Sequence, residues 1–184
     1  NVHNEGIWTN YRTILEGTND QILGQGPGKS FGGDFFDTNT GGKNIANTDL
    51  TFTGGFDLNS DTLEMQGHML SVTGWLIDGN INNTQLNGGY LEDLTSLGNL
   101  VIYGTVTCED NNYFYGNNRV EGILQSNSYG GGAHVFYLNI DGDLTNNGTI
   151  RNINSGDRLH ITITGDLENF GNWENYRTNL TGTT

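Results

Sequence analysis

A short glycine-centred motif recurs six times along the chain, and it constrains the fold more than any other feature of the sequence. The motif has the form apolar–x–apolar–x–Gly–x–Leu/Phe, and its fourth copy is degenerate. The copies are LTFTGGF at 50–56, LSVTGWL at 70–76, LTSLGNL at 94–100, NYFYGNN at 112–118, LNIDGDL at 138–144 and ITITGDL at 161–167. The spacing between successive copies is uneven, and a second glycine follows most copies and precedes another apolar residue.

Apolar residues at alternate positions are typical of a strand with one buried face. A glycine between two such strands marks a bend with no room for a side chain or with a positive φ. A unit of roughly 20–25 residues is too small to bury its own apolar face, but stacked units bury a shared core. The pattern therefore predicts an all-β chain folded as a right-handed parallel β-helix, a β-solenoid of about 7–8 irregular turns of roughly 20–25 residues. A β-sandwich with glycine-rich loops is the alternative.

The length of the chain, 184 residues, predicts a single solenoid domain over 1–184. Residues 46–184 are expected to form the regular turns, and residues 1–45 an irregular N-terminal turn or cap. Within that cap, residues 7–23 suit a short helix or a strand, and the glycine-rich residues 24–44 predict a loop or an irregular turn.

A second, longer repeat relates the two ends of the chain. The segment NEGIWTNYRTILEGT at 4–18 matches NFGNWENYRTNLTGT at 169–183 in ten of 15 positions, at an offset of 165. The two segments are either two turns of one consensus or the mark of a longer repeat, in a tandem array or in a subunit whose last turn resembles its first. Open solenoid ends have unpaired backbone groups, so we expect end-to-end self-assembly through these segments. The predicted assembly residues are Trp8, Asn10, Tyr11 and Arg12 at one end and Trp173, Asn175, Tyr176 and Arg177 at the other.

The charge of the chain limits its partners. Seven Lys and Arg stand against 21 Asp and Glu, for a formal net charge of −14. Nucleic-acid binding depends on basic residues that neutralise phosphates, so it is not expected, and neither is docking on anionic membranes. The sequence has no apolar run long enough to insert into a bilayer. The single cysteine, Cys108, excludes an intramolecular disulfide and predicts a small buried side chain, with an intermolecular bridge or a reactive thiol as the alternative.

The Gly- and Asn-rich turns, such as GDLTNNGTI at 142–150, resemble those of exported bacterial β-solenoids of the filamentous-haemagglutinin type. The resemblance covers most of residues 50–175. It implies a parallel β-helix, secretion to the cell surface or the extracellular space, and a role as an adhesin, stalk or fibre. The start at Asn1 fits either a removed export signal or an excised fragment. The two lysines and the many Asn, Gly and Thr residues also favour an exported protein. Three residues lie in acceptor sequons for N-glycosylation, which would be used only in a host that glycosylates: Asn82, Asn147 and Asn179.

Stacking of the motif copies predicts columns of side chains, and one column brings carboxylates together. Asp143 and Asp166 would lie about 5 Å apart on adjacent turns, with Asp141 nearby. A Ca²⁺ ion would suit these three oxygen donors, whereas the alternative is a set of solvated surface carboxylates. No other cofactor is expected, and the four histidines show no metal-ligand spacing.

A structural function without enzymatic activity is the main prediction, and two alternatives remain. Tyr113 and Tyr115 flank Phe114 in a predicted strand and share one face, where they suit stacking on surface glycans. A polysaccharide lyase or hydrolase on a β-helix would need a cluster of carboxylates and arginines on one face. The candidates for such a cluster are Asp141, Asp143, Asp157, Asp166, Arg151 and Arg158.

Overall fold

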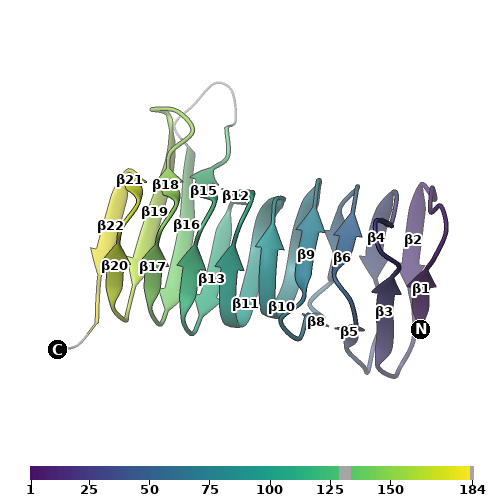
Figure 1. The fold of residues 1–184 in the computed structure, drawn as a ribbon. Helices are drawn as coiled ribbons and strands as arrows, with labels where there is room; N and C mark the ends of the chain where they lie inside the picture. The colour runs from purple at the N-terminus through teal and green to yellow at the C-terminus, as the bar shows by residue number, and fades with distance from the viewer. Residues whose placement is uncertain (129–133, 183–184) are drawn as a thin grey trace.

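The computed structural model describes residues 1–128 and 134–182, and within these ranges the chain has strands and no helix. The strands pair in parallel and stack into a β-solenoid of about 9 turns, so the predicted fold class is confirmed (Figure 1). The two termini lie at opposite ends of the rod. At a strand spacing of about 4.8 Å, the stacked turns span about 43 Å.

Over residues 1–128 and 134–182 the chain passes through twenty-two strands. They are β1 (Val2–Asn4), β2 (Arg12–Leu15), β3 (Gln21–Gln25), β4 (Asp34–Asp37), β5 (Asn44–Ala46), β6 (Leu50–Phe52), β7 (Phe56–Asp57), β8 (Thr62–Glu64), β9 (Met69–Val72), β10 (Trp75–Asn87), β11 (Tyr90–Ile102), β12 (Thr105–Glu109), β13 (Asn111–Tyr115), β14 (Asn118–Val120), β15 (Ile123–Ser126), β16 (His134–Asp141), β17 (Leu144–Asn146), β18 (Thr149–Arg151), β19 (Asp157–Ile163), β20 (Leu167–Asn169), β21 (Asn172–Glu174) and β22 (Arg177–Leu180).

Each turn has three sides, which we call face 1, face 2 and face 3 in the order the chain crosses them. Face 1 contains β5, β8, β13, β16, β19 and β22, face 2 contains β6, β9, β14, β17 and β20, and face 3 contains β4, β7, β12, β15, β18 and β21. The long strands β10 and β11 bend around all three faces.

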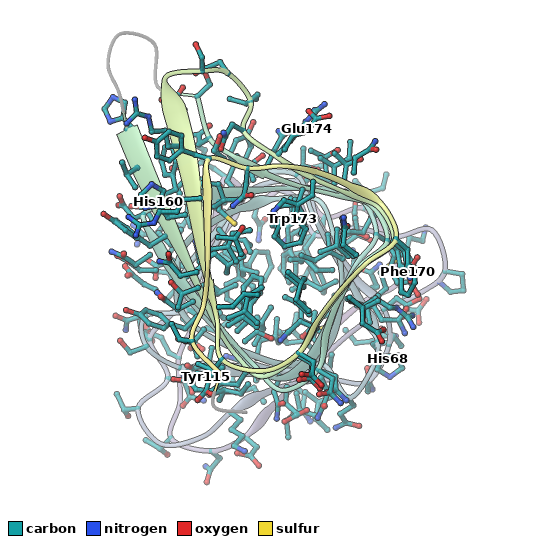
Figure 2. The ribbon with its side chains drawn as sticks, turned by 90° about the vertical axis from the view of Figure 1, so that its left-hand side faces the viewer. His68, Tyr115, His160, Phe170, Trp173 and Glu174 are labelled. Carbon is teal, nitrogen blue, oxygen red and sulfur yellow. The ribbon has the colours of Figure 1, made fainter. Side chains whose placement is uncertain are left out.

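The handedness of the rod is visible from its C-terminal end. In Figure 2 the last turn runs counter-clockwise from His160 through Phe170 to Trp173, while the chain advances toward the viewer. The β-helix is therefore right-handed, as parallel crossover connections almost always are.

Stacked apolar side chains fill the inside of the rod. On face 2 the backbone register places Leu50, Leu70, Leu86, Ile102 and Val120 over one another, and all five side chains are buried. The N-terminal half also holds a cluster of aromatic rings. The rings of Trp8, Phe31, Phe35, Phe52 and Phe56 lie with neighbouring centroids 4.9–6.2 Å apart.

The motif copies are buried as expected, but they do not form one column, and the expected 7–8 turns were too few. The copies at 50–56 and 70–76 stack on each other on face 2, whereas the later copies stack on face 1 through Ser96, Phe114, Ile140 and Ile163. The slip arises because turn length varies more than predicted. Leu76 pairs with Leu91 fifteen residues later, while Asn112 pairs with Leu138 twenty-six residues later.

The N-terminal segment is more regular than its composition suggested. Residues 7–23 contain β2 and the start of β3 rather than a helix, and residues 24–44 contain β4 and the start of β5. Glycine is required where turns approach closely at a corner. A Cβ on Gly122 would lie 1.8 Å from the carbonyl oxygen of Tyr103 in the turn below, so no other residue fits there.

Candidate functional site

The last three strands repeat the first turn of the rod at the offset seen in the sequence, but one face further round, since β2 pairs with β4 on face 3 and β22 with β19 on face 1. Adding 165 to Val2–Asn4 gives Leu167–Asn169, and adding it to Arg12–Leu15 gives Arg177–Leu180, so β1 corresponds to β20 and β2 to β22 without a shift. Trp8, which forms a bridge to Phe31, corresponds to Trp173 in β21. The sequence repeat is thus a repeat of local structure. Its last pair, Thr18 and Thr183, includes a residue outside the described ranges.

Both copies of the turn are held by the same side-chain contact. The indole nitrogen Nε1 of Trp8 donates a hydrogen bond to Thr13 Oγ1 at 3.4 Å, and Trp173 Nε1 donates to Thr178 Oγ1 at 3.1 Å. Both tryptophans are half-buried and pack against the core. In Figure 2 the Trp173 side chain points inward at the C-terminal end.

The two copies differ in what covers them. The second turn of the rod lies on the first, and Leu15 is only 3% exposed, whereas its counterpart Leu180 is 64% exposed. Asn4 is 3% exposed, while Asn169 is exposed. Each end also leaves large apolar side chains in solvent, with Ile7 and Tyr11 at least 90% exposed at the N-terminal end and Phe170 74% exposed at the C-terminal end.

The remaining predicted assembly residues lie around the rims of these ends. Arg12 places its guanidinium carbon 4.0 Å from the centre of the Phe36 ring. Tyr176 stacks on His160, with ring centroids 5.3 Å apart, and the guanidinium carbon of Arg158 lies 4.4 Å from the centre of the Tyr176 ring. Asn10 and Arg177 are exposed, whereas the Asn175 amide donates to the carbonyl oxygen of Arg177 at 2.6 Å.

Face 1 carries the predicted tyrosine pair. Tyr113 and Tyr115 are 44% and 40% exposed, and Phe114 between them is buried, as strand alternation requires. Tyr137 in β16, which sequence reasoning missed, is 46% exposed and lies diagonal to Tyr113, since Tyr113 pairs with Asn139. Three half-exposed tyrosines thus lie on two neighbouring strands of face 1.

The predicted calcium residues use their carboxylates to tie adjacent turns. Asp143 Oδ1 accepts the backbone N–H of Asp166 at 2.8 Å, and Asp141 Oδ1 accepts the hydroxyl of Thr164 at 2.9 Å. Across residues 1–128 and 134–182, no group of three or more His, Cys, Asp or Glu side chains could hold a metal ion. Calcium binding at Asp141, Asp143 and Asp166 stays a prediction.

The other residues considered for a polysaccharide-degrading site make contacts of their own. Asp157 is buried and accepts a hydrogen bond from the Asn154 amide at 2.7 Å. Arg151 donates to Gln125 Oε1 at 2.9 and 3.1 Å, and Arg158 lies over Tyr176. The three side chains are therefore engaged with different neighbours on β15, in the 152–156 connection and at the C-terminal end.

A buried carboxylate that sequence reasoning missed lies between face 3 and face 1. Asp37 is 1% exposed, and it accepts hydrogen bonds from the backbone N–H of Asn39 at 2.9 Å and from the Asn44 amide. Burial, together with the nearby charge of Asp61, raises the pKa of Asp37 to about 6, although the bonds from Asn39 and Asn44 act in the opposite direction. The signal in the sequence was only a polar residue after the apolar pair Phe35 and Phe36.

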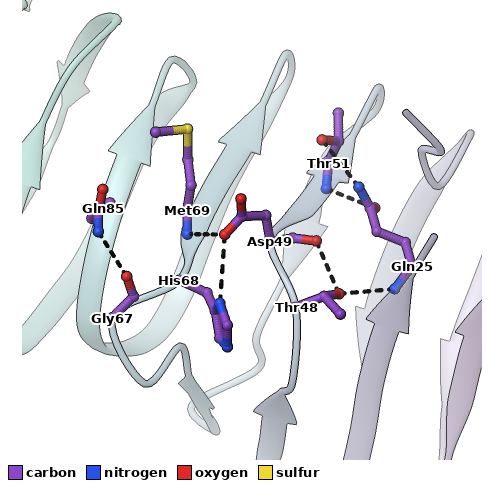
Figure 3. A network of polar contacts seen from close by, with 8 residues as sticks. All are labelled: Gln25, Thr48, Asp49, Thr51, Gly67, His68, Met69 and Gln85. Carbon is purple, nitrogen blue, oxygen red and sulfur yellow. Dashed lines mark hydrogen bonds and ion pairs between the residues drawn. The ribbon is translucent and has the colours of Figure 1, made fainter. Parts of the chain in front are cut away.

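Polar side chains also connect four turns along the edge of face 2 (Figure 3). Gln25 accepts the backbone N–H of Thr51 through Oε1 at 2.9 Å, and Asp49 Oδ1 accepts the backbone N–H of Met69 at 2.9 Å. His68 Nδ1 lies 3.5 Å from Asp49 Oδ1. These contacts satisfy backbone groups at a corner, and none of the other side chains drawn in Figure 3 joins the exposed Asp49–His68 pair to make a catalytic set.

Cys108 is the small buried residue that we expected. It is fully buried, and burial raises the pKa of its thiol to about 12, so it is not a thiolate at neutral pH.

The described residues contain no helix long and apolar enough to cross a membrane. Comparison of the chain with protein-family models, with curated proteins and with solved structures gives no match.

Proposed function

We propose that the chain is a structural module of an extracellular fibre, stalk or surface adhesin, which is extended end to end through its terminal turns. One observation carries the proposal. The first and last turns share their strands and the Trp–Thr hydrogen bond, and both leave large apolar side chains exposed.

The physics of a solenoid end supports this function. A terminal turn presents a row of unpaired backbone N–H and C=O groups, and monomeric solenoids cover that row with a polar cap. Here the terminal turns expose Tyr11, Phe170 and Leu180. A contact between unlike ends does not close on itself, so it produces linear filaments. The net charge of −14 would keep parallel rods from clumping sideways.

Electron microscopy and sedimentation velocity of the purified chain test the proposal. We expect filaments or a concentration-dependent series of oligomers, and we expect Leu180→Asp to abolish them because it places a charge on the exposed C-terminal edge. Leu97→Asp is the matched control, since Leu97 is also an exposed leucine, at 38%, but lies in the middle of the rod. Monomers at high concentration, or equal effects of the two variants, would contradict end-to-end assembly.

A second candidate function is glycan binding on face 1. It is favoured by the three adjacent half-exposed tyrosines, since flat aromatic rings stack well on sugar rings. Affinity electrophoresis in gels containing neutral polysaccharides tests it. Retardation that is lost in Tyr113→Ala and Tyr115→Ala, but kept in Tyr103→Ala on face 2, would support this candidate.

A further inference from the structure

We infer that the free edge of the C-terminal turn binds the second turn of another copy of this chain, residues 21–37, so that consecutive copies share one turn. This inference rests on the proposed end-to-end function and adds the register of the junction. The incoming copy gives up its own first turn, and the equivalent C-terminal turn of its neighbour takes that place, as in domain swapping. The repeat of such a fibre would equal the offset between the two matching segments.

The structure already contains one example of the contact. The first turn carries the second turn on its free edge, with β1 paired to β3, Trp8 bridged to Phe31 and β2 paired to β4. The C-terminal turn reproduces the first turn of this pair, with β20 in place of β1, Trp173 in place of Trp8 and β22 in place of β2. An edge with the same strand bounds and the same Trp–Thr hydrogen bond should accept the same partner.

Asparagine side chains point to the same register. Asn4 Nδ2 donates to the carbonyl oxygen of Ser30 in the next turn at 2.8 Å, and Asn146 Nδ2 donates in the same way to Asn172 at 3.0 Å. Each also accepts the backbone N–H two residues later. Asn169 is the counterpart of Asn4, and its Nδ2 has no acceptor within the part of the chain that the structure describes. The carbonyl oxygen of Ser30 in a second copy would supply that acceptor.

Charge supports the shared-turn register. Arg12 is opposite Asp34 in the strand pairing and lies over the Phe36 ring. In the shared-turn register, Arg177 takes the place of Arg12 and meets Asp34 and Phe36 of the incoming copy.

The apolar side chains that the junction would cover also support the shared-turn register. Trp8 packs edge-on against Phe31 at 5.3 Å and lies 6.2 Å from Phe35. In the proposed junction Trp173 would gain the same two rings from the incoming copy. Leu180 is 64% exposed. Under the same cover, its exposed fraction would fall toward the 3% of its counterpart, Leu15. Burial of apolar area of this kind is the main source of stability between stacked turns.

Two fused proteins test the register with the whole chain. In the shared-turn fusion, residue 184 of one copy is joined to residue 20 of a second, because residue 184 corresponds to residue 19 at the offset of 165. In the control fusion, residue 184 is joined to residue 1. We expect the shared-turn fusion to melt in one transition, about 5 °C or more above the single chain, because its internal edges are covered. The control fusion should melt at the temperature of the single chain.

A charge reversal provides a second measurement that does not depend on the linker. Arg177→Asp in the first copy should lower the melting temperature of the shared-turn fusion more than it lowers that of the single chain, because only the fusion places Asp34 opposite it. Arg119→Asp, which disrupts a surface ion pair with Glu121 in the middle of the rod, should act equally in both proteins.

The outcomes separate this inference from the proposed function. A shared-turn fusion that melts no higher than the single chain, or an equal effect of Arg177→Asp in both proteins, would overturn the register even if separate chains form filaments. A stabilised shared-turn fusion with the expected Arg177→Asp effect would support the register even if separate chains stay monomeric, which would count against free end-to-end assembly alone.

Discussion

Replacement of Asp37 by Asn should make the protein more stable at neutral pH than it is with its natural residue. Asp37 is 1% exposed, and the pKa of its carboxyl is raised from 3.8 to about 6, first by burial and then by Asp61. A group that binds its proton more tightly in the folded state stabilises the fold when protonated. The contribution of Asp37 to the unfolding free energy therefore falls as the pH rises from about 4 to about 6, and it stays low above that range.

A rise of the pKa from 3.8 to about 6 corresponds to about 3 kcal/mol between the protonated and ionised forms. An asparagine keeps the carbonyl oxygen that accepts from the Asn39 N–H. Its amide nitrogen would meet the Asn44 amide, but the Oδ1 atom of Asn44 is buried and has no hydrogen-bond partner among the described residues, so a flip of Asn44 presents an acceptor. The substituted asparagine therefore fits without a lost hydrogen bond and without a buried charge.

Urea unfolding, followed by tryptophan fluorescence and far-UV circular dichroism between pH 4 and pH 8, measures the effect. The difference in unfolding free energy between Asp37→Asn and the natural protein should be small near pH 4 and grow to as much as about 3 kcal/mol in favour of the variant above pH 7. Asp166→Asn, at an exposed carboxylate, should show a small difference throughout. A difference for Asp37→Asn that does not change with pH would refute this account of the buried carboxyl.

Three further predictions concern the corners and the core. Gly122→Ala should lower the unfolding free energy by more than about 3 kcal/mol, because its Cβ would meet a backbone oxygen at 1.8 Å. In the same urea titration Gly6→Ala should be neutral, because a Cβ at Gly6 would have nothing within 4 Å. Asn146→Ala should cost about 2–3 kcal/mol, because it breaks bonds to both neighbouring strands of the last turn, whereas the exposed Asn147→Ala should cost less than about 1 kcal/mol in thermal melts. Cys108 should react with Ellman's reagent only as fast as the solenoid opens, so that a rapid reaction in native buffer would contradict its burial.

The glycine-centred motif was sufficient to predict a parallel solenoid and the burial of its apolar positions, because both follow from strand alternation within a single turn. It did not predict how turns align, because alignment depends on the lengths of the connections. The short turn between Leu76 and Leu91 moves the later copies of the motif from face 2 to face 1. As a result Trp75 pairs with Tyr90 rather than lying over Asn99, as the simple column of motif positions required.

Buried polar residues were the other limit. Asn112 breaks the apolar pattern of its motif copy, yet it is 0% exposed, and it accepts the Leu94 N–H and donates to the carbonyl oxygens of Leu91 and Glu109. No local pattern distinguishes such an asparagine from a solvated one. By contrast, the end-to-end repeat was visible as sequence identity, and only the difference in coverage between Leu15 and Leu180 needed the structure.

The parallel stacking of turns also determines how the rod would respond to force. Hydrogen bonds between strands run along the axis of the rod, so a pull on its two ends loads these bonds along their length. Turns would then detach from an end one after another rather than all at once. The shortest turn, from Leu76 to Leu91, would release about 50 Å of chain, and the longest, from Asn112 to Leu138, about 90 Å. A fibre of such rods would lengthen in many small, unequal steps, and it would absorb tension without breaking a covalent bond.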